Sequence, residues 1–152
     1  EKALNKPELG QFKKAGVAPQ RVLKEFRLED LASYNVGDVV TVEKFAQGDK
    51  VDVAGVTKGH GFSGVIKRWN HHRLKETHGV GPVHREVGSM GANSSPSRVF
   101  KNKLMPGQYG HENVTIQNLE IVKVDVARNA LLIKGAIPGP RGGYVTIADS
   151  VK

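Results

Sequence analysis

The sequence predicts a mainly β protein, a small antiparallel β-barrel or sandwich that carries one long insertion. Outside residues 58–111, apolar side chains alternate with polar ones in several short runs, as they do in strands with one buried face. Turn-forming glycine and proline residues separate these runs. Residues 58–111, in contrast, are basic, rich in glycine and poor in apolar side chains, so they cannot form a core of their own.

One helix and three strands are expected before the insertion. Residues 7–16 read PELGQFKKAG and fit a short helix, whereas residues 21–28 fit a strand better than a helix. Residues 39–45 and 49–56 are predicted to pair as strands across the turn-like AQGD. Inside the insertion, residues 62–69 are the one candidate for another short helix.

A hairpin and a last strand are expected after the insertion. In residues 121–126 valine alternates with Lys123 and Asp125, and residues 131–137 resume the alternation after the turn-like ARNA. Residues 144–149 read YVTIAD and form the last short strand. The chain would therefore alternate short strands with glycine- and proline-containing turns on both sides of the insertion.

These elements divide the chain into a β-barrel domain, residues 1–57 and 112–152, and an inserted extension, residues 58–111. An insertion of this length is unusual in a compact domain and is typically functional or disordered. Of the net charge of +8, +7 lies in the extension, which holds nine Lys and Arg against two acidic residues, and all six histidines. This composition suits a chain threaded along a phosphate-rich surface, whereas a solvated loop would usually mix its signs.

Several classes of protein are disfavoured. The chain has no cysteine, which excludes disulfides, thiolate metal sites and cysteine nucleophiles. No apolar run approaches the ~18 residues that span a bilayer, and no amphipathic basic helix favours the alternative of a membrane-surface or protein-binding module. The histidines lack metal-ligand spacing, and the extension offers its serines only two acidic residues as partners for catalysis. We therefore expect no metal, no cofactor and no enzymatic activity.

Three glycines raise an alternative of another class. Gly59, Gly61 and Gly64 spell G-x-G-x-x-G after a predicted strand, as in a nucleotide-binding enzyme. Such a site also needs a helix directly after the glycines, but the chain continues as VIKRWNHHRLKETHGVGP, without a parallel βαβ unit. We interpret the glycines as places where the backbone approaches RNA closely, with a plain turn as the open alternative.

The candidate RNA contacts share a cationic or aromatic side chain within the extension. Lys and Arg would pair with phosphates, and His would stack on bases or donate to phosphates. Trp69 and Tyr109 could stack in the same way, or could equally pin the extension to the barrel. The candidate contacts are Lys58, His60, Lys67, Arg68, Trp69, His71, His72, Arg73, Lys75, His78, His84, Arg85, Arg98, Lys101 and Lys103. Backbone approach to RNA is expected at Gly59, Gly61, Gly64, Gly88 and Gly91, whereas Phe62 and Phe100 are expected to pack against the barrel.

Three motifs occur in order along the chain: KGxGFxGxIKR, then GSxG followed by RVFK, then NxLLxKGAxPG. With them, the chain closely resembles the large-subunit ribosomal protein three family of the bacterial type over nearly its whole length. The resemblance implies a barrel of the translation-protein type and a long loop that runs into ribosomal RNA. It also implies a cytoplasmic role in the large subunit, without a catalytic side chain.

The family binds 23S rRNA early in large-subunit assembly, beside ribosomal proteins fourteen and nineteen, so the same partners are implied here. The residues implied to lie nearest the peptidyl transferase centre form the tip of the extension: Ser89, Met90, Ala92, Asn93, Ser94, Ser95 and Pro96. The chain departs from the family in two places. Family members begin with further strands before LNKPELG, so the barrel is expected to be incomplete, and the tip lacks the Gln that some members methylate.

Overall fold

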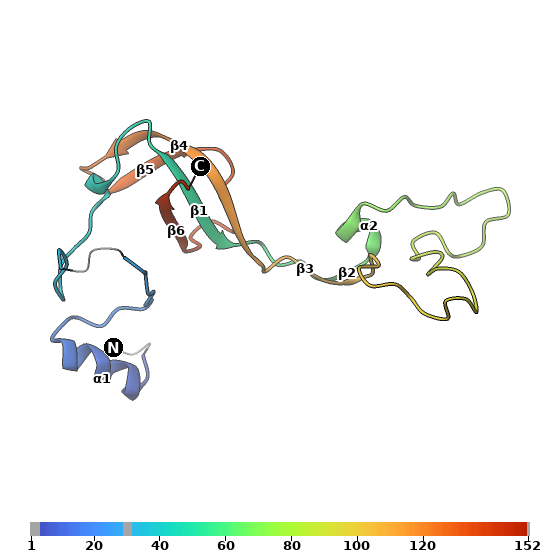
Figure 1. Ribbon diagram of the computed structural model, residues 1–152, viewed down its shortest axis with the longest axis horizontal. Coiled ribbons are helices and arrows are strands. Elements are labelled where there is room, and N and C mark those ends of the chain that lie inside the picture. The colour runs from blue at the N-terminus through green and yellow to red at the C-terminus, as the bar shows by residue number, and fades with distance from the viewer. Residues whose placement is uncertain (1–3, 29–31, 152) are drawn as a thin grey trace.

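The computed structural model describes residues 4–28 and 32–151. The remaining positions, which the sequence assigns to the barrel domain, lie outside the described residues. The main unit is a four-stranded antiparallel sheet in the order β5-β4-β1-β6 (Figure 1). Its strands are β1 (Lys50–Val56), β4 (Asn113–Asp125), β5 (Ala130–Lys134) and β6 (Val145–Asp149).

The core of the sheet is small. Val51 and Val53 of β1 and Ile121 of β4 are fully excluded from solvent. Partly buried apolar side chains surround them: Phe45, Leu119, Val124, Leu131, Ile133 and Ile147. Burying side chains of this size stabilises the fold by roughly 1.5–3 kcal/mol each, so these three residues are the main source of order in the sheet.

An irregularity in the pairing of β1 with β4 lies next to this core. The register shifts between Val51 and Val53, and on β4 Asn118 takes a left-handed conformation with φ of 58°. The backbone N–H of Asn118 donates to Oδ1 of Asp52, a buried carboxylate, at 2.9 Å. The side chain of Asp52 thus satisfies a backbone group that the bulge removes from the ladder.

Three of the expected strand regions are confirmed, and two predicted strands are wrong. The strands expected at 49–56 and 144–149 and the hairpin after 121 correspond to β1, β6 and the β4–β5 pair. Residues 39–45 form no strand and contain instead a short 3-10 helix, η1 (Val42–Lys44). The physical reason is that β1 already pairs with β4 on one side and β6 on the other, so no edge of β1 is left for residues 39–45.

Residues 21–28 also form no strand. Their apolar side chains stand in solvent, with Leu23 64% and Phe26 59% exposed. Alternating hydrophobicity alone cannot order a strand that has no neighbour to pair with.

The expected helix at 7–16 is confirmed as α1 (Lys6–Ala15). Pro7 stands in its first turn, and the backbone N–H of Asn5 donates to the Glu8 carboxylate at 2.8 Å. Gly16 ends the helix in a left-handed conformation, and Phe12 is its buried residue. Neither α1 nor any other helix of the described residues has the length and apolarity needed to cross a membrane.

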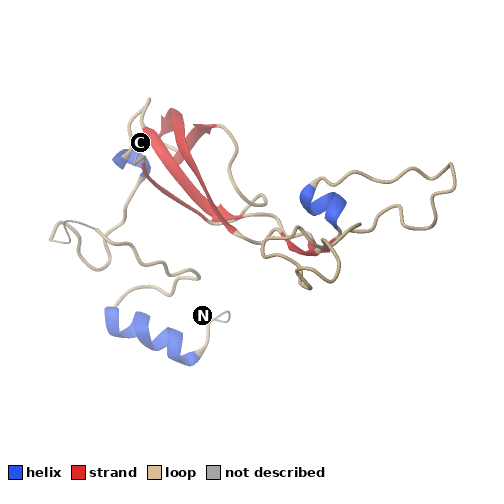
Figure 2. Cartoon of the chain, turned by 45° about the vertical axis from the view of Figure 1, so that its right-hand side comes forward, coloured by secondary structure: helices blue, strands red, loops and turns tan. Residues whose placement is uncertain are grey.

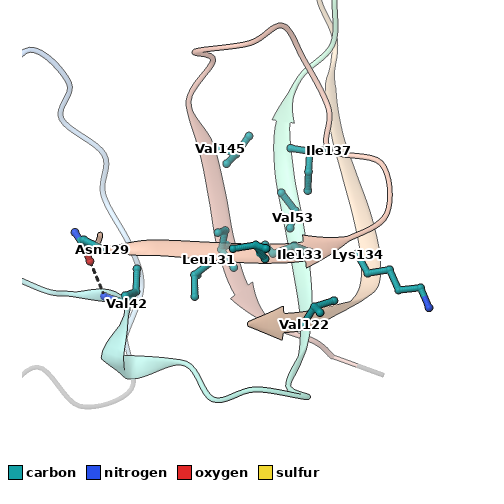
Figure 3. Close-up of a pocket in the computed structure, with 11 residues that line it drawn as sticks. Val42, Val53, Val122, Asn129, Leu131, Ile133, Lys134, Ile137 and Val145 are labelled. Carbon is teal, nitrogen blue, oxygen red and sulfur yellow. Dashed lines mark hydrogen bonds between the residues drawn. The ribbon is translucent and has the colours of Figure 1, made fainter. Parts of the chain in front are cut away.

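The described strands do not close into a barrel, because β5 and β6 remain at opposite edges of the sheet. One region of the sheet is an open apolar groove, which Figure 3 shows with Val53, Leu131 and Ile133 in it. At one end of the groove, the Val42 N–H donates to Asn129 Oδ1 at 3.0 Å, so η1 is tied to the β4–β5 turn (Figure 3). The structure therefore shows a mainly β, antiparallel fold with an uncovered apolar groove.

Candidate nucleic-acid interface

The basic segment, residues 58–111, leaves the sheet between two strands that pair with each other. Val56 at the end of β1 pairs with Asn113 at the start of β4, and the Thr57 N–H donates to the Glu112 carbonyl at 2.9 Å. From this point both arms run together away from the sheet (Figures 1 and 2). The pairing of β1 with β4 therefore sets the place and direction in which the basic segment starts.

A narrow neck follows, formed by β2 (Gly61–Ser63) and β3 (Gly107–Tyr109). The two strands are antiparallel, and the His60 ring stacks on the Tyr109 ring with centroids 5.0 Å apart. Gly110 brings the arms into close contact, because a Cβ at this position would lie 2.0 Å from the Lys58 carbonyl oxygen. Its φ of 74° also favours glycine.

The three glycines of the G-x-G-x-x-G pattern lie around this neck, and each has a different geometry. Gly61 needs its φ of 66°, Gly59 makes only an ordinary contact with His111, and Gly64 faces open space at the start of α2 (Val65–Trp69). The helix has five residues, and every pair of strands in the described part of the chain is antiparallel. A dinucleotide site needs a parallel βαβ unit, so the pattern does not form one here.

Arg68 and Trp69 end α2 and face the returning arm. Arg68 Nη1 donates to the Met105 carbonyl oxygen at 3.0 Å, and Trp69 Nε1 donates to the same oxygen at 2.9 Å. The Arg68 guanidinium also lies over the Trp69 ring, 4.9 Å from its centroid. Two of the candidate RNA contacts are thus engaged with the protein itself.

The outgoing arm, residues 70–87, folds back on itself once. The Leu74 N–H donates to the His84 carbonyl at 3.1 Å, and His84 Nδ1 lies 3.1 Å from the Lys75 carbonyl. Arg73 pairs with Glu76 on the surface. The candidate contacts of this arm are mostly exposed: His72, Arg73, Lys75, His78 and Arg85, with His71 and His84 half-buried.

The tip, residues 88–96, is fully on the surface. Gly88 and Gly91 have φ of 77° and 146°, so their backbone conformations alone explain why glycine stands there, without a close approach to RNA. The Ser89 hydroxyl donates to the Gly91 carbonyl at 3.3 Å. All the predicted tip residues are exposed: Ser89, Met90, Ala92, Asn93, Ser94, Ser95 and Pro96.

The returning arm, residues 97–106, brings three more exposed cations back toward the neck: Arg98, Lys101 and Lys103. The Arg98 guanidinium lies over the Phe100 ring at 5.2 Å, and that ring is still 56% exposed. Phe62 on β2 is 81% exposed, so the expectation that it packs against the sheet is wrong. The reason is that β2 pairs only with β3 and buries Ser63, so the neighbouring Phe62 lies on the opposite, uncovered face of a two-stranded sheet.

The electrostatics of the basic segment are simple. Of its nine Lys and Arg, only Arg73 lies within ion-pair distance of a carboxylate among the described residues. In the same part of the chain, His and acidic side chains do not gather in groups that could hold a metal ion. The arrangement offers a row of uncompensated positive charges along two arms, which is suited to a polyanion.

Sequence reasoning missed three residues that shape this region. Met105 supplies the carbonyl shared by Arg68 and Trp69, and Gly107 and Gly110 allow the two arms to approach each other. The available signal was the pair of glycines around Gln108 and Tyr109, the first of which begins β3 while the second directly follows it. A backbone carbonyl, in contrast, carries no signature in the sequence.

Comparison with known proteins gives a consistent result. Residues 24–130 match the sequence model of the family described as ribosomal protein L3. The chain belongs to the ribosomal protein L3 family. It is 55% identical over 153 aligned residues to the large ribosomal subunit protein uL3 of Acetivibrio thermocellus, and covers 72% of that protein. It is 53% identical over 152 residues to the uL3 of Fervidobacterium nodosum and covers 73% of it; both alignments span the whole chain.

The family membership confirms the resemblance that the motifs predict. The family is one of structural ribosomal proteins and not of enzymes, so the alternative of a nucleotide-dependent enzyme is wrong. This agrees with the geometry of the three glycines, since Gly61 begins β2, Gly64 precedes α2 and Gly59 lies in the connection before them.

Proposed function

We propose that the chain is a structural constituent of the large ribosomal subunit, working in the cytoplasm, and that its basic segment binds 23S rRNA. The observation that carries the proposal is the placement of a +7 segment on two exposed arms that project from the sheet. The names of the relatives, large ribosomal subunit protein uL3, support the subunit assignment. The role is to bind and hold rRNA during subunit assembly.

The basic segment would act as an inserted rRNA-binding extension of a scaffold formed by residues 1–57 and 112–152. A further layer over the apolar groove would complete a barrel of the translation-protein type. The open groove around Leu131, Ile133 and Ile147 supports this, because an apolar groove of this kind is stable when another layer covers it.

The exposed cations of the arms would pair with phosphates, and Phe62 would stack on an unpaired base. The exposure of Phe62, 81%, supports this role, since a ring beside basic residues is a typical platform for RNA bases. The tip residues 89–96 would lie nearest the peptidyl transferase centre, and ribosomal proteins fourteen and nineteen would be neighbours. All of this is binding, and no side chain is assigned a chemical step.

The test is a titration of the full chain with a 23S rRNA transcript between 50 and 200 mM salt. The logarithm of the binding constant should fall linearly with that of the salt concentration, by about 0.7–0.9 for each phosphate neutralised. Acidic lipid vesicles and NAD serve as competitors. Weak salt dependence, or preferred retention on vesicles, would contradict the proposal.

A further inference from the structure

The contacts between α2 and the returning arm form a compact unit, the clasp, made of Arg68, Trp69, Met105 and Gly107. The Met105 carbonyl oxygen accepts two hydrogen bonds, one from Arg68 Nη1 at 3.0 Å and one from Trp69 Nε1 at 2.9 Å. A carbonyl oxygen has two lone pairs, so this double use satisfies it fully. The clasp spans 36 and 37 positions of sequence and closes the loop that holds the arms and the tip.

Gly107 is part of the clasp because its lack of a side chain leaves room for the Arg68 guanidinium. A Cβ at this position would lie 2.5 Å from Arg68 Nη1 and 3.3 Å from its Cζ. Gly107 shows no left-handed φ, so backbone strain does not require glycine here. Glycine is required because the Arg68 guanidinium occupies the space that a Cβ would fill.

The clasp lies where the two arms separate. On one side of it the arms are held by the β2–β3 pairing and by the stack of His60 on Tyr109. On the other side the hydrogen bonds and the ion pair are local, such as the pairing of Arg73 with Glu76, but residues 85–88 and Met90 also line one pocket together with Gly64, Val65 and Pro106. The clasp is thus the hydrogen-bonded contact that joins α2 to the returning arm where both arms leave the neck.

We propose that Arg68 and Trp69 are positioning residues, which strengthen RNA binding by holding the two arms in the bound arrangement and not by touching the RNA. This rests on the proposed function, since it assigns a role within rRNA binding. The physical reason is preorganisation: an arm already held in its bound geometry loses less conformational freedom on binding. Arg68 is half-buried, and its Nη1 is directed at the Met105 carbonyl oxygen and not at solvent.

The decisive variant is Gly107→Ala, which displaces the Arg68 guanidinium without changing any charge. Gly81→Ala is the matched control, since it lies in the same segment and a Cβ there meets open space. Trp69 is the only tryptophan of the chain, so its fluorescence reports on the clasp directly. In the free protein, acrylamide should quench Trp69 more strongly in Gly107→Ala than in the wild type, with Gly81→Ala unchanged.

The second measurement is binding to 23S rRNA as a function of salt. Gly107→Ala and Arg68→Gln should each weaken binding about three- to tenfold, the effect of losing a hydrogen bond of this kind. Neither should change the slope of the binding constant against salt, although Arg68→Gln removes a charge. Loss of a direct phosphate contact would instead reduce the slope by about 0.7–0.9.

Each outcome decides a different point. Unchanged quenching in Gly107→Ala would overturn the clasp itself, and does not depend on RNA. Increased quenching with unchanged affinity would overturn the positioning role, and a reduced slope in Arg68→Gln would show a direct phosphate contact instead. A wild-type chain that fails to bind 23S rRNA in a salt-dependent way would overturn the proposed function while leaving the quenching result intact.

Discussion

The sheet and the basic segment are held together by different physical means. In the sheet, Val51, Val53 and Ile121 are fully buried and the order comes from apolar packing. In the basic segment the fully exposed tip has no core and Val65 of α2 is the one buried apolar side chain among the described residues, so most of the order comes from a neck of two three-residue strands and a shared carbonyl. The comparison teaches that stability and RNA binding in this protein can be changed separately.

The largest effect is expected from removing the arms while keeping the neck. Replacing residues 71–103 with a short Gly-Ser linker is feasible, because Trp69 and Met105 already contact each other. Affinity for 23S rRNA should fall on the order of a thousandfold or more, since most of the phosphate-pairing cations are lost. Thermal unfolding of the sheet, followed by circular dichroism, should change little. Binding as tight as that of the wild type would remove the functional distinction between the two regions.

A core substitution should have the opposite pattern. Ile121→Ala leaves a cavity beside Val51 and Val53, and should lower the free energy of unfolding by about 2–5 kcal/mol in urea titrations. The salt slope of RNA binding by the folded fraction should remain the same. Val122→Ala, at a position 46% exposed, is the control and should cost far less. Equal effects at 121 and 122 would show that the core is not where the structure places it.

The neck connects the two regions, and Gly110→Ala tests it. The added Cβ would lie 2.0 Å from the Lys58 carbonyl oxygen, so the backbone of one arm must move. We expect a loss of stability greater than the ~1–3 kcal/mol of an unfavourable φ alone, together with weaker RNA binding. Gly142→Ala is closely matched, with φ of 75° and open space around it. Melting temperatures that fall equally in both variants would mean that the close approach at the neck is unimportant.

Phe62→Ala separates an RNA contact from a packing contact. Because the ring is 81% exposed, its loss should leave the melting temperature nearly unchanged. If it stacks on a base, affinity for 23S rRNA should fall by about 1–3 kcal/mol. Phe62→Tyr keeps the ring and should bind normally. A lower melting temperature with unchanged affinity would restore the packing interpretation.

The smallest effect is expected from single exposed lysines. Lys103→Gln on the returning arm should reduce the salt slope by about 0.7–0.9, the contribution of one phosphate. Lys134→Gln, an exposed lysine of β5, removes the same charge from the sheet and should leave the slope unchanged. Equal changes would indicate that net charge matters and its placement does not.

The sequence was informative where the signal is local. Alternation in residues 49–56 and 121–126 predicted β1 and part of β4, and Pro7 with Gly16 marked the two ends of α1. It failed for residues 39–45, whose alternation resembles that of a strand. Pairing depends on which edges other strands leave free, and β6, which begins at Val145, occupies the edge that these residues would need.

For the candidate site, composition alone located the charge: +7 within residues 58–111 identified the segment and the type of partner. Composition could not separate the side chains that are free for RNA from those that hold the arms. Arg68 and Lys67 are adjacent cations in the sequence, yet Arg68 bonds to Met105 while Lys67 stands in solvent.

The sequence by itself therefore determined the family, the β character and the position of the basic segment, because motifs, alternation and charge are properties of neighbouring residues. Only the tertiary structure decided the strand order, the exposure of Phe62 and the clasp of Arg68 and Trp69 on Met105. The strand order and the clasp depend on which groups far apart in the sequence come within about 3 Å of each other, the range at which hydrogen bonds act. The exposure of Phe62 depends on which parts of the chain pack beside it.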